Sequence, residues 1–372
     1  MITETVRQLA KELDSVLAST TLGEPCFFSN NYRSNPFDIK NFHQIQPSAN
    51  HRRIAFVDGG HQAIIETPTV SINLNRVYFN IFEGRKRVAI KGLNQRIEFF
   101  SVTTGTFEND YPHYKTAIYP VNGDFNSILP NESLLEFTPN SGTNVNDRPI
   151  LDITRVSSIA RRFAEWSLSK HVVKELLEDK DILVMDGTLK AAFPNESEYC
   201  ASCYRLAATK GVIYTGLAKS SRLFTTTGLS LIGAIMELAS NIGLGGVWYY
   251  HPIAESLSPE HAAELFMAKL HNHSDRIFRY DIQSEQARKM GRDELGEIIS
   301  QLSVNSTDPS FLGYPYGLID ADDNARVRDE EVQSYRIMVL SEISNMGSWR
   351  KFLREMQAID AHEGINFLKA GI

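Results

Sequence analysis

The sequence predicts an α/β protein with a mixed β-sheet flanked by helices. Two aliphatic runs, residues 54–57 and 182–185, are each followed by an Asp-Gly pair, and such runs are typical of strands buried on both faces. Between them, residues 69–82, 87–91 and 96–103 have strand-like patterns separated by turn residues. Apolar residues at helical spacing predict helices before, between and after these strands.

The composition is that of an ordinary globular protein. The chain has 372 residues, 42% of them hydrophobic, and carries a net charge of −7. That charge does not indicate a nucleic-acid binder, so positive charge for DNA or RNA must be local or come from a partner. Three cysteines cannot form a disulfide framework here, and neither a signal peptide nor a membrane span is recognisable. We therefore expect a cytoplasmic protein.

The N-terminal third begins with an amphipathic helix from Thr3 to about Leu22, followed by an irregular connection to residue 51. The first strand ends at Asp58, where Gly59 and Gly60 suit a tight turn, and opens a three-strand antiparallel meander. The polar stretch of about residues 105–150 is then expected to be a long surface insertion.

The middle of the chain begins with a helix from Thr154 to about Glu178, which carries Glu165. A second buried strand then ends at Asp186, and a loop with Cys200 and Cys203 follows it. Further strands are expected at residues 211–218, 247–250, 263–270 and 276–282, with a short helix near 229–239.

The C-terminal part enters a segment carrying Asp320, Asp322 and Asp323, and a strongly helical tail follows. We expect three regions: an N-terminal helix with an irregular segment at 1–50, a main domain at 51–330, and C-terminal helices at 331–372.

Several polar residues have both a chemical and a structural interpretation. Asp58 and Asp186, each at the end of a rigid strand, suit a metal or a proton, although Asp-Gly pairs also form plain turns. For Glu165 the structural interpretation is a surface ion pair with Arg161. The Cys200–Cys203 spacing is zinc-like but lacks a second pair, so free thiols are expected.

Several positive and imidazole side chains also have two interpretations. Lys219 and Arg222 at a strand end could face phosphates or could belong to a solvated loop. Arg276 and Arg279 are able to face a polyanion, and His271 and His273 are more typical of surface histidines than of metal ligands.

The order of these elements is similar to that of the ribonuclease-H-like fold, in which the first and fourth strands lie side by side and carry paired aspartates. Adjacent strands are about 4.8 Å apart, so their carboxylates can bind divalent ions jointly. Two such ions support phosphodiester cleavage, and hard oxygen ligands favour Mg²⁺ or Mn²⁺ over zinc.

More closely, the sequence resembles the NurA family of nucleases. The resemblance is carried by short blocks in a common order: residues 56–60, Arg162 with Glu165, 184–189, 216–221, 278–281, and 313–318 running into Ala321-Asp322. It implies a Mn²⁺-dependent DNase with 5′-to-3′ exonuclease and single-strand endonuclease activities. It also implies a homodimer that docks on a hexameric HerA-type ATPase for DNA end processing or defence against phage.

By position, the resemblance assigns metal binding to Asp58, Glu165, Asp186 and Asp322, and phosphate contact to Lys219. Asp322 stands where many family members have histidine, which leaves open whether Asp320 or Asp322 is the last ligand. Two rivals remain: a non-catalytic adaptor of a motor ATPase, and an RNA-cleaving or Argonaute-like nuclease of the same fold.

Overall fold

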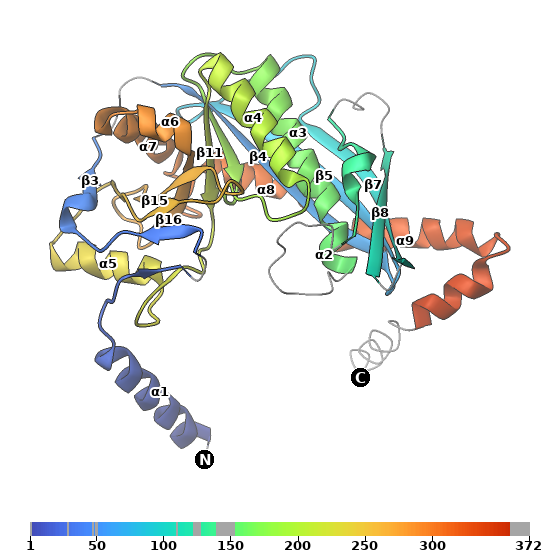
Figure 1. Ribbon diagram of the computed structural model, residues 1–372, viewed down its shortest axis with the longest axis horizontal. Helices are drawn as coiled ribbons and strands as arrows, with labels where there is room; N and C mark the ends of the chain where they lie inside the picture. Colours follow the sequence, from blue (N-terminus) through green and yellow to red (C-terminus); the bar gives the residue numbers. More distant parts are fainter. Residues whose placement is uncertain are drawn as a thin grey trace. The chain divides into compact units, whose positions relative to one another are not determined.

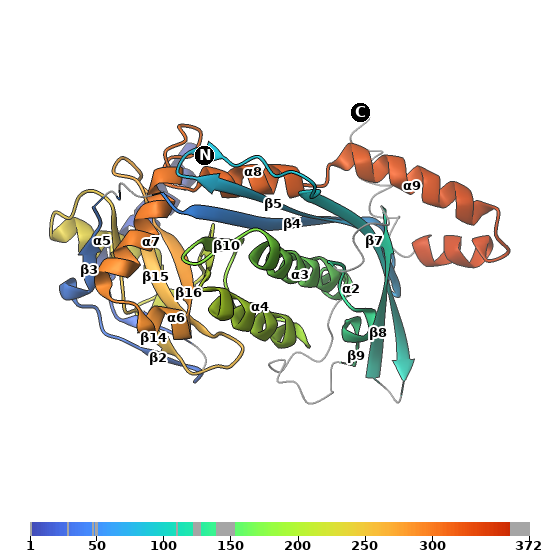
Figure 2. The same ribbon diagram turned by 90° about the horizontal axis from the view of Figure 1, so that it is seen from above.

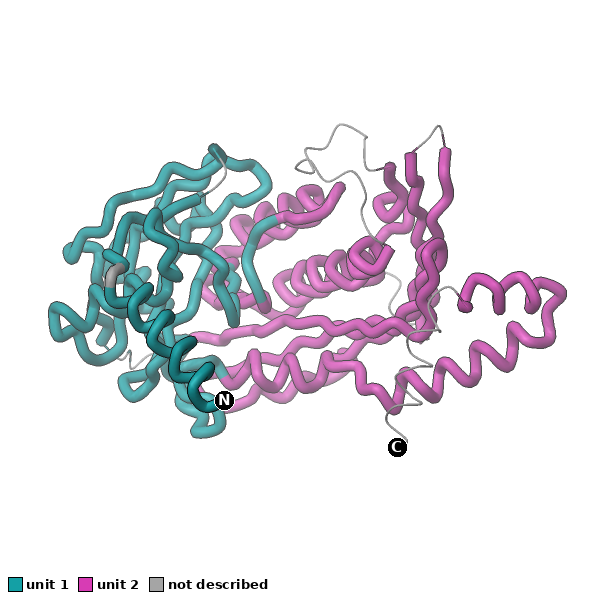
Figure 3. The backbone as a smooth tube through the Cα atoms, turned by 90° about the horizontal axis from the view of Figure 1, so that it is seen from below, with its two compact units in different colours: residues 1–51, 187–190, 215–315 teal, residues 52–186, 191–214, 316–372 magenta. Residues whose placement is uncertain are grey.

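The computed structural model describes residues 2–27, 30–46, 48, 51–108, 111–121, 128–138 and 153–357 (Figure 1). These residues form two compact units, which are coloured in Figure 3. Unit 1 comprises residues 1–51, 187–190 and 215–315, and unit 2 comprises residues 52–186, 191–214 and 316–372. Among the described residues, no helix is long and apolar enough to cross a membrane.

Unit 2 is built on a mixed β-sheet. Its strands are β4 (Arg53–Glu66), β5 (Val70–Glu83), β6 (Lys86–Arg87), β7 (Arg96–Glu108), β8 (Tyr111–Pro120), β9 (Glu136–Phe137) and β10 (Ile182–Asp186). Successive strands from β4 through β5, β7, β8 and β9 pair antiparallel, with β6 also paired to β5. On its other side β4 pairs parallel with β10. Beyond β10, Ile213 at the start of β11 (Ile213–Ala218) donates its amide to Asp181.

This topology is ribonuclease-H-like, and it confirms the predicted fold class. The sheet begins with the antiparallel strands β4, β5 and β7, which β8 and β9 extend, and β10 then returns to lie parallel to β4. The aliphatic residues 54–57 and 182–185 are fully buried, because helices cover the sheet on both faces in this region. The predicted pairing of the two aspartate-bearing strands is therefore correct.

Helices cover opposite faces of β4 and β5, as Figure 2 shows. On one face lie α3 (Ile159–Glu175) and α4 (Glu196–Lys210), preceded by the short α2 (Ile153–Ser157). On the other lies α8 (Tyr316–Ala325), which approaches so closely that a Cβ at Gly317 would overlap the Phe56 ring. Helix α9 (Asp329–Ser344) and helical residues 349–357 confirm the C-terminal helical extension as far as the structure describes it.

Unit 1 contains a second group of paired strands. The order β3 (Phe42–Gln44), β13 (Trp248–Tyr250), β15 (Ala263–Lys269), β16 (Phe278–Gln283) and β11 is antiparallel throughout. Short pairs join β1 (Pro25–Cys26) to β12 (Phe224–Thr225) and β2 (Tyr32–Ser34) to β14 (Ala254–Ser256). Its helices are α1 (Ile2–Ser19), α5 (Leu231–Asn241), α6 (Ser284–Lys289) and α7 (Arg292–Asn305), and α1 confirms the predicted N-terminal helix.

Two expectations about the first strands are wrong. Strand β4 does not end at Asp58 but continues to Glu66, so Gly59 and Gly60 do not form a turn. The expected insertion at 105–150 begins instead with sheet, because β7 runs to Glu108 and β8 pairs with it. The buried positions of β8 are Pro112, Tyr114 and Thr116, and such residues hide the usual apolar alternation. Residues 122–127 and 139–152 of that stretch lie outside the described residues.

The prediction of a loop around the two cysteines is also wrong. Cys200 and Cys203 lie on α4 rather than in a loop, and both are buried free thiols. The Sγ of Cys203 donates to the carbonyl of Trp166 on α3, so the pair belongs to the packing between the two helices. Burial raises the pKa of Cys203 to about 11, which keeps this thiol protonated at neutral pH.

Candidate active site

Asp58 and Asp186 are neighbours in the sheet of unit 2. The parallel register pairs Val57 with Met185, so the next residue of each strand is the aspartate. Neighbouring strands are about 4.8 Å apart, which brings the two carboxylates within reach of a common ligand. Asp58 is only 6% exposed, and its Oδ1 accepts from the Gly59 amide at 2.7 Å. The two acids that the sequence singled out are thus brought together by strand pairing.

Glu165 reaches the same strand from α3. The side chain is 2% exposed, so the alternative of a surface ion pair is wrong, although its partner is indeed Arg161. Arg162 also pairs with it, at 3.1 Å. A Cβ at Gly59 would lie 2.5 Å from Glu165 Oε1, so only glycine lets the carboxylate approach the β4 backbone.

The charge state of Glu165 reflects competing effects. Burial raises its pKa above the ordinary value, while Arg161 and Arg162 act in the opposite direction without cancelling it. Asp186 also raises the pKa of Glu165, which means that the two carboxylates lie within electrostatic range of one another. Asp58 and Asp186 are therefore neighbours through strand pairing, and Glu165 lies within electrostatic range of Asp186.

A buried glutamate holds Arg162 in place. Glu196 at the start of α4 is fully buried and accepts from Arg162 Nε at 2.8 Å and from Trp166 Nε1 at 2.8 Å. It also accepts from the amides of Ala192 and Phe193. The sequence reasoning missed Glu196, since an acid in the first turn of a helix is an ordinary feature.

The acids of α8 lie in different surroundings. Asp322 lines a cavity of about 190 Å³, with Asp58, Gly59, Gly60, His61, Ala325, Arg326 and Val327 as its other lining residues. Its carboxylate pairs with Arg326 at 2.9 Å. Asp320 instead accepts from Asn80 at 2.7 Å and pairs with Arg87 at 3.1 Å. Of these two acids, Asp322 shares a cavity with Asp58, whereas Asp320 is bonded to residues of the sheet.

His61 is a cavity residue that the sequence reasoning missed. Burial, together with the nearby Arg161, lowers its pKa to about 4, so the imidazole is neutral at pH 7. No motif marks this position, because its role depends on β4 continuing beyond Asp58.

Glu165 and Asp322 are ion-paired with arginines. Among the described residues, no group of three or more His, Cys, Asp or Glu side chains is arranged to hold a metal ion. Their chemistry nevertheless suits Mg²⁺ or Mn²⁺, because hard cations prefer carboxylate oxygens. A cation would replace the positive charge that Arg161, Arg162 and Arg326 now supply.

Lys219 lies in unit 1, outside the unit that contains the four acids. It follows directly after β11 and is exposed, as the expected strand-end position requires. Within unit 1, Gly216 of the same strand faces the carbonyl of Gly187, and a Cβ would lie 2.6 Å from that oxygen. The contact of Lys219 with a phosphate remains a prediction.

Unit 1 contains a buried polar cluster that the sequence did not predict. Asp281 is fully buried and accepts from Arg279 Nε at 2.8 Å and from the Leu189 amide at 3.2 Å. His261 Nε2 lies 3.0 Å from Asp281, and its Nδ1 lies 3.0 Å from the Tyr32 hydroxyl. The expectation that Arg279 faces a polyanion is therefore wrong, because its guanidinium is bonded to Asp281.

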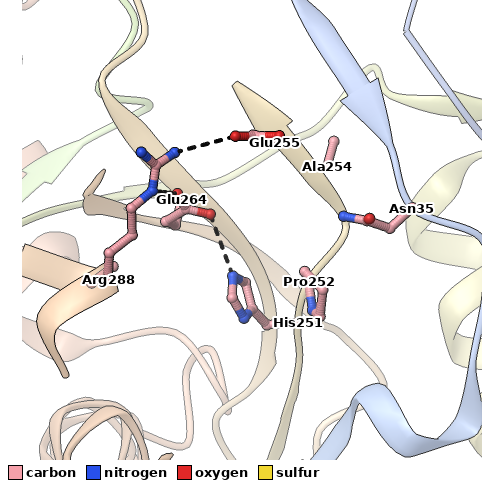
Figure 4. Close-up of a pocket in the computed structure, with 8 residues that line it drawn as sticks. Asn35, His251, Pro252, Ala254, Glu255, Glu264 and Arg288 are labelled. Carbon is pink, nitrogen blue, oxygen red and sulfur yellow. Dashed lines mark hydrogen bonds and ion pairs between the residues drawn. The ribbon is translucent and has the colours of Figure 1, made fainter. Parts of the chain in front are cut away.

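A second cavity, of about 290 Å³, also lies in unit 1 (Figure 4). In it Glu264 accepts from Arg288 Nε at 2.9 Å and lies 3.6 Å from His251, whose ring stacks on Phe266. Its charged side chains are paired with one another, and none of them was singled out from the sequence.

Comparisons with known proteins identify the family of this chain. A family model described as the NurA domain matches residues 52–327. The crystal structure of the NurA nuclease from Sulfolobus solfataricus is 13% identical, with 92% of this chain and 96% of that chain covered and a TM-score of 0.48. No curated protein matches the chain.

Two other solved structures resemble the fold. Endonuclease V of Ciona intestinalis in complex with DNA is 10% identical over 90% of this chain and 99% of that chain, with a TM-score of 0.35. Argonaute of A. aeolicus is 9% identical over 74% of this chain and 28% of that chain, with a TM-score of 0.28.

Proposed function

We propose that this chain, which belongs to the NurA family, is a metal-dependent DNA nuclease. Family membership over residues 52–327 supports phosphodiester hydrolysis. The finer assignment is a deoxyribonuclease with 5′-to-3′ exonuclease and single-strand endonuclease activities. The observation that supports the nuclease assignment is the parallel pairing of β4 and β10, which sets Asp58 beside Asp186.

The residues have distinct proposed roles. Asp58, Glu165, Asp186 and Asp322 would hold Mn²⁺ or Mg²⁺. Such ions, when bound in a pair, activate a water molecule and stabilise the leaving oxygen in phosphodiester cleavage. Gly59 keeps the β4 backbone open to Glu165, and Glu196 orients Arg162 against that carboxylate. Lys219 would contact a phosphate of the substrate.

Asp322 is the preferred choice for the last ligand. Asp322 shares a cavity with Asp58, which supports this choice. Its exposed ion pair with Arg326 is weak, so a metal ion could replace Arg326 at little cost. Asp320 is the poorer choice, since Asn80 and Arg87 already bind its carboxylate.

The proposal extends to partners. A net charge of −7 gives the chain little general affinity for DNA, which favours a positively charged partner. We assign that role to a hexameric HerA-like ATPase that feeds DNA to a homodimer of this chain in the cytoplasm. DNA end processing and phage defence are the two pathways that this pairing suits.

Metal binding tests the proposal without relying on cleavage. Titration calorimetry of the full chain with Mn²⁺ should detect binding that Asp58→Ala and Asp186→Ala weaken by at least roughly tenfold. Asp275→Ala, which removes an exposed acid of unit 1, is the matched control and should bind as the wild type does. Equal Mn²⁺ binding by the wild type and both site variants would contradict the ligand assignment.

A further inference from the structure

Helix α1 has an apolar face that is exposed to solvent. Five side chains form what we call the α1 stripe: Ile2, Val6, Leu9, Leu13 and Val16. They are 53–82% exposed, so no described part of the chain covers them. A free helix of this length is marginally stable in water, and an amphipathic helix normally gains its stability by burying such a face. The α1 stripe therefore requires an occupant.

The spacing of the stripe indicates that the occupant is another helix. Its residues follow one another at intervals of four, three, four and three. This is the 3.5-residue repeat of a two-stranded coiled coil. Ala10 and Leu17, the latter 54% exposed, border the stripe on one side, and Thr5 borders it on the other.

The polar face of α1 argues against a membrane. It carries Glu4, Arg7, Lys11, Glu12 and Asp14. Two positive and three negative charges give a net charge of −1, whereas helices that lie on membranes have a polar face rich in Lys and Arg. The same balance gives no attraction to a nucleic acid.

The stripe is complementary to itself when two copies run antiparallel. The order Val6, Leu9, Leu13, Val16 reads the same in both directions about Lys11. In an antiparallel pair centred there, valine meets valine and leucine meets leucine in four successive layers. A two-fold pairing of this kind uses the same surface on both copies, which is the commonest symmetry of homodimers.

The charges favour the same orientation. Residues 2–11 carry Glu4, Arg7 and Lys11, a net charge of +1, whereas residues 12–19 carry Glu12 and Asp14, a net charge of −2. An antiparallel pair sets each positive half beside a negative half, and it also opposes the two helix dipoles. A parallel pair would set like halves together.

We propose that α1 is the dimerisation helix of this protein and pairs antiparallel with α1 of a second copy through the α1 stripe. The inference rests on the homodimer in the proposed function, and it adds the surface and the orientation. It does not depend on nuclease activity, because none of the proposed site residues lies on α1.

Sedimentation equilibrium of the full-length chain tests the surface. Leu9→Lys/Leu13→Lys should weaken the dimer by roughly 100-fold or more, because charge is placed in the two central layers. Gln8→Lys/Ser15→Lys adds the same charge to the polar face of the same helix and should leave the dissociation constant unchanged. The replaced leucines are exposed in the single chain, so equal thermal unfolding of both variants checks that the units still fold.

The outcomes separate the inference from the wider proposal. A stripe variant that dimerises as tightly as the wild type would overturn the role of α1 while leaving a homodimer through another surface. A wild-type monomer would contradict both the inference and the proposed homodimer. Stripe-dependent binding to anionic phospholipid vesicles by the wild type would also overturn the inference.

Disulfide trapping tests the orientation. In a Cys26→Ser background, Thr3→Cys and Leu17→Cys chains of different tag length are mixed and oxidised. The antiparallel pair brings Thr3 of one copy beside Leu17 of the other, so the mixed disulfide should predominate. A Thr3→Cys chain that links mainly to itself would show a parallel pair and contradict the proposed orientation.

Discussion

The glycines at positions 59 and 60 allow neighbouring groups to approach strand β4 closely and do not form a turn. The two residues face opposite sides of β4, where a Cβ at Gly59 would meet Glu165 of α3. A Cβ at Gly60 would overlap the carbonyl of Ala325, the last residue of α8. The pair therefore sets how near the two acid-bearing helices come to Asp58, which explains why glycines follow an aspartate in the middle of a strand.

Gly59→Ala is expected to disturb the site more than the fold. The new Cβ forces Glu165 aside, which should cost about 1–3 kcal/mol in the free energy of unfolding. Cleavage should fall at least tenfold, because the carboxylate no longer meets the strand. Gly245→Ala adds the same methyl group where no atom lies within 4 Å and serves as the control. Chemical denaturation and a cleavage assay on both variants check this, and unchanged cleavage by Gly59→Ala would contradict it.

Asp281 should make the stability of the protein dependent on acid pH. Burial alone would raise its pKa, but Arg279 and then His261 outweigh burial and hold the pKa well below the ordinary 3.8. A lowered folded-state pKa adds stability that is complete above that ordinary value and is lost as the pH falls below it.

Asp281→Asn should accordingly cost about 3–5 kcal/mol at pH 7, since it leaves Arg279 without its buried partner. The difference from the wild type should shrink below pH 3.8. Denaturant unfolding between pH 3 and pH 8 measures both quantities, with the exposed Asp275→Asn as the control. A cost that does not change across that pH range would show that the charge of Asp281 is not what stabilises the cluster.

At the scale of elements, α8 illustrates what a sequence pattern can and cannot distinguish. Asp320 and Asp322 are two residues apart, so the helix points them in different directions. From the sequence alone, either one could be the fourth metal ligand beside Asp58, Glu165 and Asp186. In the structure Asp320 is bonded to Asn80 and Arg87 of the sheet, whereas Asp322 lines the cavity beside Asp58.

Alanine at the two positions should have opposite effects. Asp320→Ala removes a bonded carboxylate from the α8–sheet contact and should cost about 1–3 kcal/mol of stability. Asp322→Ala breaks an ion pair at the surface, worth about 0–1 kcal/mol, yet should lower cleavage by at least roughly 100-fold. Thermal unfolding and cleavage rates of the two variants decide the matter. The reverse pattern would make Asp320 the ligand.

Elements with long, simple patterns were predictable, and those with mixed patterns were not. The N-terminal helix was predictable from its helical spacing and the two aliphatic strands from their continuous apolar runs, although the first strand extends beyond its predicted end. The sequence predicts a loop where the cysteine helix α4 lies, since the apolar residues of this segment are few and it follows an irregular stretch. Strand β8 was missed because threonine, tyrosine and proline occupy its buried positions.

The candidate site was predictable only in part, for a similar reason. Strand order and the family resemblance pointed to Asp58, Glu165 and Asp186. The structure places Asp58 and Asp186 on paired strands and Glu165 within electrostatic range of Asp186, and their role as metal ligands remains a prediction. Glu196, His61 and the Asp281 cluster were missed, because their importance depends on burial and on partners distant in the sequence. The division at residues 50 and 330 remains a prediction.

At the scale of the whole molecule, the net charge of −7 should make a partner necessary for efficient action on DNA. We expect weak DNA binding by the isolated chain and a strong rise in cleavage rate when a cognate HerA-like hexamer is added. Fluorescence anisotropy and a cleavage time course with and without the hexamer measure both effects. Tight binding by the chain alone, with no stimulation by the hexamer, would contradict this account.

The most direct test of the central claim is cleavage of labelled linear single- and double-stranded DNA, with an RNA of the same sequence beside it. Purified wild type should cut DNA with Mn²⁺ or Mg²⁺ and not with EDTA, and Asp58→Ala and Asp186→Ala should abolish cutting while unfolding as the wild type does. Undiminished cleavage by either variant would contradict the site. If the wild type cleaved no DNA with any metal, even with a cognate translocase present, the protein would be a non-catalytic adaptor instead.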